Sequence, residues 1–153
     1  MSPTMLRLLR TSWDPTVPVA RFVLAAIFIG HGTQKAFGWF GGMGFDKSLD
    51  FFQTTMSIPA PVTIFLMFTE LSASLGLILG LLNRVAAFGL FCTMVVAPFA
   101  NHLYPRFFMN WSGTRGGEGY EYHLLAIALL LGIMYRGAGA LSLDHWLSSR
   151  HKG

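Results

Sequence analysis

The residue types that could do chemistry in this sequence lie inside its apolar segments. Glu70 stands near the middle of one apolar run, and His31, Gln34 and Lys35 in another are spaced i, i+3 and i+4. That spacing places the three side chains on one face of a helix. An ionisable group within the hydrocarbon costs about 2.5–3.5 kcal/mol on insertion scales, so it usually faces a partner or a cavity. We therefore expect Glu70 to meet Lys35 or His31.

Four apolar segments can carry these residues, at about 17–37, 60–82, 84–104 and 122–143. Each has the roughly 20 residues that a helix needs to cross about 30 Å of hydrocarbon. Helices satisfy their own backbone groups, which lipid cannot do. Hydrophobic residues make up 53% of the 153 residues and charged residues 12%, about half the usual fraction of roughly 25%. These features predict an all-α integral membrane protein, a bundle of four transmembrane helices.

The segments outside these spans predict the organisation of the chain. We expect residues 1–16 to form an N-terminal cytoplasmic leader, 17–147 the four-helix membrane domain, and 148–153 a C-terminal tail. Between the first two spans, apolar residues at helical spacing indicate a short interfacial helix with Asp46 as its N-cap. Seven Lys and Arg residues lie on the side of both termini and four on the other. This asymmetry favours cytoplasmic termini and a location in the inner (plasma) membrane.

Antiparallel spans bring polar residues from distant parts of the sequence to one layer of the bundle. Glu70 is the candidate catalytic residue, because a positioned carboxyl group can relay a proton. Alternatives stay open, since Lys35 could extend its amine to the interface. The histidines could be ordinary interfacial residues, and Arg21 is expected to be structural or lipid-facing. The candidate binding residues are His31, Gln34, Lys35, Glu70, Asn101, His102 and Glu121.

Other classes of site receive less support. His31, His102 and His123 could form a nitrogen–oxygen set for a metal ion together with a carboxylate. No segment carries a compact pair such as HxxxH, so these histidines are only weak candidates and no metal site is predicted. The single cysteine, Cys92, excludes a disulfide within the chain. We find no haem, flavin or iron–sulfur motif. The basic residues are dispersed rather than gathered in a stripe, which argues against nucleic-acid binding.

Several motifs form a recognisable series. Arg21 precedes Gly-His-Gly-Thr-Gln-Lys at 30–35 and Gly-Trp-Phe-Gly-Gly at 38–42. Glu70 is followed by glycines and leucines at 76–81, and the segments 117–121 and 137–144 complete the series. Together they resemble the DoxX family of small four-helix membrane proteins, over about residues 18–147. The first-span motif is the most specific part.

The resemblance implies a function in or beside a redox complex. Some members are a subunit of a thiosulfate:quinone oxidoreductase, and others belong to membrane complexes that handle thiols and oxidative stress. We expect a membrane component of such a system that binds a quinone, or a similar small molecule, in a polar pocket among the helices. The alternative is a non-enzymatic scaffold or accessory subunit for a soluble oxidoreductase, alone or as a homo-oligomer. A His/Glu metal site or a small-molecule transporter is a weaker alternative, and enzymatic activity stays open.

Overall fold

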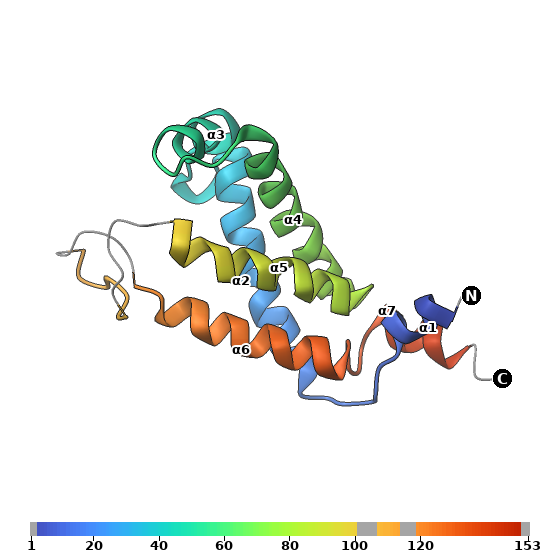
Figure 1. Ribbon diagram of the computed structural model, residues 1–153. Coiled ribbons are helices and arrows are strands. Elements are labelled where there is room, and N and C mark those ends of the chain that lie inside the picture. Colours follow the sequence, from blue (N-terminus) through green and yellow to red (C-terminus); the bar gives the residue numbers. More distant parts are fainter. Residues whose placement is uncertain (1–2, 101–106, 114–118, 151–153) are drawn as a thin grey trace.

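The computed structural model describes residues 3–100, 107–113 and 119–150, and within these ranges every regular element is helical (Figure 1). The predicted all-α fold is therefore confirmed. The elements are α1 (Pro3–Leu9), α2 (Val17–Phe37), the 3₁₀ helix η1 (Trp39–Gly41), α3 (Gly44–Thr54), α4 (Ala60–Leu79), α5 (Asn83–Ala100), α6 (Glu121–Arg136) and α7 (Leu143–Ser149).

Two helix pairs form the body of the molecule. α2 packs along α4, α5 packs along α6, and the short turn from α4 to α5 joins the pairs (Figure 1). This turn lies between the ends of α4 at Leu79 and α5 at Asn83, where the predicted spans 60–82 and 84–104 meet. Dispersion contacts rather than water exclusion hold such helices together in lipid, so close packing matters. The fully buried side chains at the centre are Leu24, Phe28, Leu77, Leu90, Leu130 and Ile133.

The described helices differ in their ability to cross a membrane. Within the described ranges, α2 and α4 are long and apolar enough to span a bilayer, whereas α5 is apolar but shorter. The helix in the region of the predicted fourth span, 122–143, has only 16 residues and ends at Arg136. Gly137 takes a positive φ of 85°, which L-residues with side chains avoid, and stops the helix there. A membrane bundle is supported, but the structure does not establish four complete spans.

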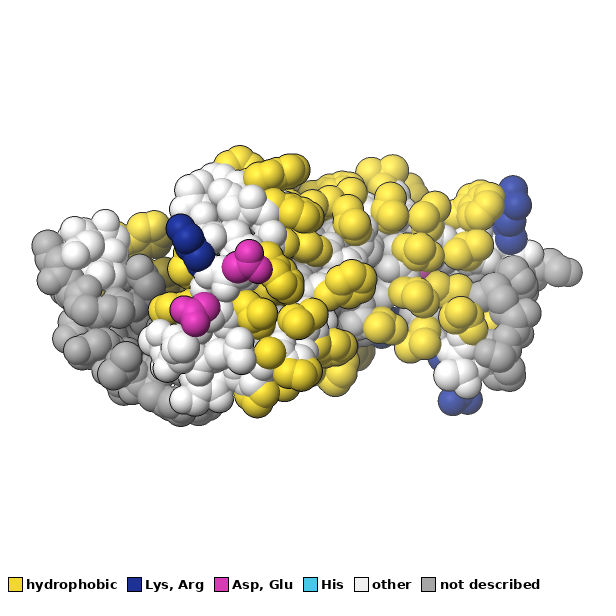
Figure 2. Space-filling view, turned by 90° about the horizontal axis from the view of Figure 1, so that it is seen from above, with side chains coloured by type: hydrophobic (Ala, Val, Ile, Leu, Met, Phe, Trp, Pro, Cys, Tyr) yellow, Lys and Arg dark blue, Asp and Glu magenta, His cyan; other side chains and the backbone are white. Residues whose placement is uncertain are grey.

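Large apolar side chains cover the outside of the bundle. Figure 2 shows hydrophobic side chains across the middle of one face, with charged side chains nearer its two ends. Phe65 and Phe68 of α4 are 68% and 72% exposed, and Leu125 of α6 is 68% exposed. Contiguous apolar surface of this kind is unfavourable in water and marks a contact with lipid or with a partner.

A buried arginine fastens the end of the molecule that carries both termini. Arg21 of α2 has no exposed surface and donates hydrogen bonds to five backbone carbonyls. Two of these carbonyls, those of Leu77 and Ile78, belong to α4, and the other three lie in the segment 138–141. The structure thus selects the structural interpretation of Arg21 and excludes the lipid-facing one. The guanidinium satisfies its donors with carbonyls of the last turn of α4, which the helix would otherwise leave unpaired, and with carbonyls of the segment that follows α6.

A second polar contact at this end holds the start of α5. Both carboxylate oxygens of the buried Asp144 accept backbone N–H bonds, at 2.8 Å from Leu82 and 2.9 Å from Asn83. Burial raises the pKa of the Asp144 carboxyl group, and the two N–H donors oppose that shift. A carboxylate at a helix N-terminus also complements the helix dipole. Asp144 therefore ties α7 to the turn between α4 and α5.

At the opposite end, α3 occupies the position of the predicted interfacial helix (Figure 1). Its N-cap residue is Met43, and no side chain caps the helix. The prediction of Asp46 as the N-cap is therefore wrong, because the chain enters the helix three residues earlier and Asp46 lies in its first turn. There a negative charge still complements the helix dipole.

Candidate functional site

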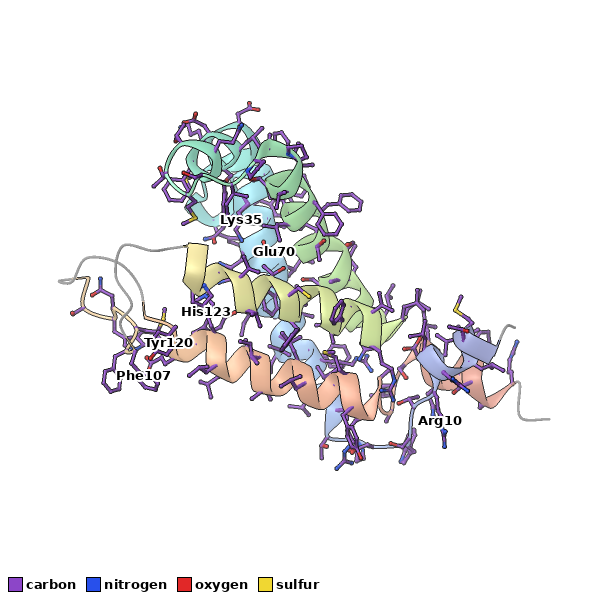
Figure 3. The ribbon with its side chains drawn as sticks, in the orientation of Figure 1. Arg10, Lys35, Glu70, Phe107, Tyr120 and His123 are labelled. Atoms are coloured by element: carbon purple, nitrogen blue, oxygen red, sulfur yellow. The ribbon has the colours of Figure 1, made fainter. Side chains whose placement is uncertain are left out.

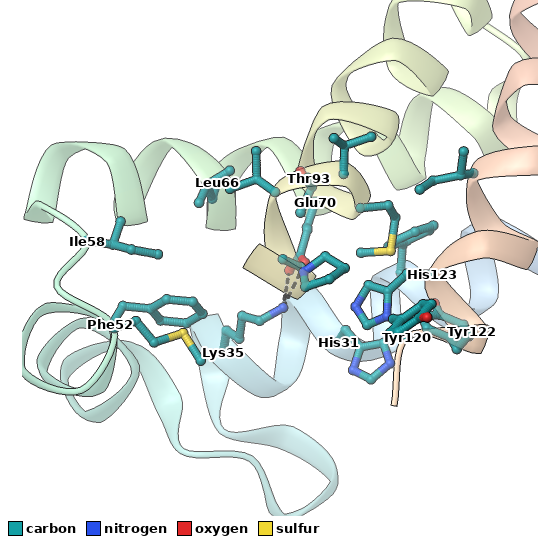
Figure 4. Close-up of a pocket in the computed structure, with 18 of the residues that line it drawn as sticks. His31, Lys35, Phe52, Ile58, Leu66, Glu70, Thr93, Tyr120, Tyr122 and His123 are labelled. Carbon is teal, nitrogen blue, oxygen red and sulfur yellow. Dashed lines mark hydrogen bonds and ion pairs between the residues drawn. The ribbon is translucent and has the colours of Figure 1, made fainter. Parts of the chain in front are cut away.

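Lys35 of α2 and Glu70 of α4 form an ion pair inside the bundle. The Lys35 ammonium donates to both oxygens of Glu70, at 2.7 Å to Oε1 and 2.5 Å to Oε2 (Figures 3 and 4). The Glu70 side chain is only 5% exposed, whereas that of Lys35 is 25% exposed. The structure thus pairs Glu70 with Lys35 rather than with His31. An ammonium has three N–H donors, so one remains for a further acceptor.

This ion pair lies on the wall of a cavity of about 730 Å³. Phe52 of α3, Leu66 of α4, Met94 of α5 and Ile127 of α6 line it with apolar side chains. Cavities of about 300–1,000 Å³ with mostly apolar walls and a few placed polar groups are typical small-molecule sites. The arrangement can therefore hold an apolar molecule and direct a charge-assisted hydrogen bond at one of its atoms.

Three further polar residues, one from α2 and two from α6, line the same cavity. The rings of His31 and Tyr122 lie 6.4 Å apart between centroids, and those of Tyr122 and His123 lie 5.5 Å apart. All three residues line the cavity. Figure 4 shows them together on one side of the Lys35–Glu70 pair, with Phe52 and Ile58 on the other.

Comparison with known proteins identifies the relatives of this chain. Residues 16–103, more than half of the chain, match the DoxX family. The chain belongs to the DoxX family. A relative from Haemophilus influenzae, described as an uncharacterized protein, is 33% identical over 129 residues, which cover 82% of this chain and 85% of that protein. No solved structure matches the sequence.

Membership in the DoxX family confirms the resemblance inferred from the sequence. It also indicates where the protein is located. DoxX proteins are a membrane protein family associated with redox or oxidative-stress systems. This DoxX chain is accordingly a membrane protein, and its exposed apolar side chains on α4 and α6 suit contact with lipid or with a partner. The match includes both Lys35 and Glu70, whereas Tyr122 and His123 lie beyond its last residue.

The other sequence-predicted site residues of this DoxX protein have different positions. Gln34 does not line the cavity, although its spacing to His31 and Lys35 predicted a shared face. Its backbone instead lies against Gly42 in the turn after α2. Glu121 is also absent from the cavity wall; its carboxylate accepts the Met109 N–H at 2.9 Å and holds the segment 107–113 against α6. Asn101 and His102 lie outside the described residues.

The metal hypothesis gains no support from the described ranges. Among residues 3–100, 107–113 and 119–150, no three His, Cys, Asp or Glu side chains gather closely enough to hold a metal ion. His31 and His123 both line the cavity. The third histidine of the weak candidate set, His102, lies outside the described residues.

Sequence reasoning missed Tyr122 as a site residue. A tyrosine at the start of a membrane helix is typical of the interfacial aromatic belt, so its position gave no reason to place it inside. The available signal was its spacing to Ala126, Leu130 and Ile133, which are buried residues on one face of α6. Tyr122 precedes them at i−4, i−8 and i−11, so it belongs to the inward face of the helix.

Proposed function

We propose that this DoxX protein is a membrane component of a redox or oxidative-stress system that binds a quinone, or a similar flat carbonyl compound, in the cavity beside Lys35 and Glu70. The single observation that carries the proposal is an ion pair in the wall of an apolar cavity of about 730 Å³. A quinone ring needs apolar walls and a hydrogen-bond donor at its oxygen, and this cavity supplies both.

The chemistry of the pair suits a carbonyl oxygen. Glu70 holds the Lys35 ammonium with two hydrogen bonds, and the third N–H can donate to a ligand oxygen. A donor fixed in advance binds an acceptor without the entropy of ordering a free side chain. When the bound oxygen gains electrons, the ammonium also lies where negative charge develops and where a proton is required. Electrons would come from a partner of the redox system.

A second candidate function is a scaffold or accessory subunit for a soluble oxidoreductase, alone or as a homo-oligomer. The direct contact between Lys35 and Glu70 favours it, because this contact links α2 to α4 with no ligand required. In this case the ion pair would serve helix packing. Both functions agree with termini at one end of the molecule (Figure 1), which we assign to the cytoplasmic side of the inner membrane from the excess of positive charge there.

Equilibrium binding to the purified protein in detergent tests the proposal. We expect saturable binding of 2,3-dimethyl-1,4-naphthoquinone, whose blocked ring positions prevent reaction with the exposed Cys92 thiol. Lys35→Met should weaken binding about tenfold or more, the effect of losing one charge-assisted hydrogen bond. Lys47→Met, which removes an exposed ammonium on α3, should leave the Kd unchanged. Absence of saturable binding to the wild-type protein, with a co-purifying oxidoreductase, would favour the scaffold instead.

A further inference from the structure

The two ends of the cavity differ in chemistry (Figure 4). Beyond the Lys35–Glu70 pair on one side lie Phe52 and Ile58, from α3 and the segment before α4, with no polar atom in their side chains. On the other side lie His31, Tyr122 and His123. A ligand that fills the whole cavity must therefore present apolar atoms to the first end and polar atoms to the second.

The polar end contains two hydrogen-bonding atoms without a partner. The Tyr122 hydroxyl and His123 Nδ1 are buried, and neither has a hydrogen-bond partner in the structure as described. Buried polar groups are nearly always paired, so each unpaired group requires an explanation. These two belong to neighbouring residues that both line the cavity, and a ligand atom at this end would supply the missing partner.

We propose that Tyr122, supported by His123, forms a second recognition point in this cavity. The ligand then carries two oxygens on opposite sides of one ring: Lys35 donates to the first and the Tyr122 hydroxyl donates to the second. A hydrocarbon substituent on that ring extends toward Phe52 and Ile58. This inference rests on the proposed function and narrows its ligand to para-quinones with an apolar chain, in place of carbonyl compounds in general.

Two probes with the same ring skeleton separate one-point from two-point binding. 2,3-Dimethyl-1,4-naphthoquinone has two opposed carbonyl oxygens, and 2,3-dimethyl-1-tetralone has one. The variant is Tyr122→Phe, which removes only the hydroxyl. The matched control is Tyr135→Phe on the same helix, since the Tyr135 side chain is 83% exposed and outside the cavity.

We expect Tyr122→Phe to weaken binding of the naphthoquinone about fivefold, the effect of one neutral hydrogen bond. Binding of the tetralone, which reaches only Lys35, should stay the same. Tyr135→Phe should change neither Kd. Circular dichroism of Tyr122→Phe should match that of the wild type, so that a lost interaction is not confused with a lost fold.

Two results would contradict the inference, and only one of them would also contradict the proposed function. If the naphthoquinone binds with a dependence on Lys35 but an unchanged Kd in Tyr122→Phe, the second recognition point is wrong and the proposed function stands. If neither probe binds the wild-type protein, the quinone site itself is wrong, and the second recognition point is lost with it.

Discussion

Loss of Lys35 should destabilise the protein more than loss of Glu70, because the two partners differ in exposure. In Lys35→Met the Glu70 carboxyl group, 5% exposed, loses its cation and its hydrogen-bond donor at depth. In Glu70→Gln the Lys35 ammonium, 25% exposed, can extend along its flexible stem toward the cavity and water. Removing one partner of a buried ion pair costs roughly 3–5 kcal/mol. The partial exposure of Lys35 favours the lower end, about 3 kcal/mol, for Lys35→Met.

Glu70→Gln should cost less, about 1 kcal/mol, because the amide oxygen keeps one acceptor for the ammonium. The double variant Lys35→Met/Glu70→Leu leaves no unpaired carboxyl group in the interior, so we expect it to be about 2 kcal/mol more stable than Lys35→Met alone. Unfolding by titration with sodium dodecyl sulfate in mixed micelles, followed by circular dichroism, measures these differences. Lys47→Met on the exposed face of α3 is the control and should change stability by less than about 0.5 kcal/mol.

The reasoning fails if the two single variants lose equal stability, or if the double variant is no more stable than Lys35→Met alone. Equal losses would mean that burial of the side chain left behind does not determine the loss of stability. A double variant no more stable than Lys35→Met would mean that the unpaired Glu70 carboxyl group does not cause that loss, contrary to its burial and its 2.5 Å contact with Lys35.

Three further predictions concern the end of the molecule near the termini and the glycines. Asp144→Asn should lower the free energy of unfolding by about 1–2 kcal/mol, because the amide provides one acceptor where the carboxylate provides two for the start of α5; the same unfolding assay measures it. Gly80→Ala should lose more stability than Gly113→Ala, although both positions have positive φ, 62° and 65°. A Cβ at Gly80 would lie 2.4 Å from a Ser142 carbon, whereas a Cβ at Gly113 meets nothing within 4 Å; comparable losses would contradict this. Hydrogen bonds from Thr16 hold the pKa of Asp14 below its ordinary value of 3.8, so this carboxylate contributes stability above pH 3.8 that is lost as the pH falls through its lower pKa in the folded protein. Thr16→Val should bring the Asp14 pKa, followed by NMR, closer to 3.8; an unchanged pKa would exclude the hydroxyl as the cause.

The helical architecture follows largely from local properties of the sequence. Apolar segments of about 20 residues predicted α2 and α4 to within three residues at each end. Hydropathy gave no reason to end the fourth segment at residue 136, because Gly137, Ala138 and Ala140 are as compatible with an apolar run as with a turn. The helix stops there because Gly137 takes a positive φ, while the carbonyls of Ala138 and Ala140 accept hydrogen bonds from Arg21, 117 and 119 residues away in sequence.

Local features of the sequence predicted one part of the candidate site, and packing between distant residues determined the other part. The cost of a carboxylate in an apolar helix predicted that Glu70 has a partner, and helical spacing limited the candidates to one face of α2. Which residue on that face makes the contact depends on the rotation of α2 against α4. That rotation brings Lys35 to Glu70 and leaves Gln34 beside the turn at Gly42.

The sequence by itself determined that this is a helical membrane protein of the DoxX family. It also determined that Glu70, an acidic residue in an apolar helix, needs a partner. Composition, segment length and short motifs act locally, and each can be read without knowing what the chain folds against. Only the tertiary structure decided that Arg21 is buried, that Lys35 is the partner of Glu70, and that Tyr122 faces the same cavity. These contacts join residues 35 to 120 positions apart, so they depend on how the helices pack and rotate against one another.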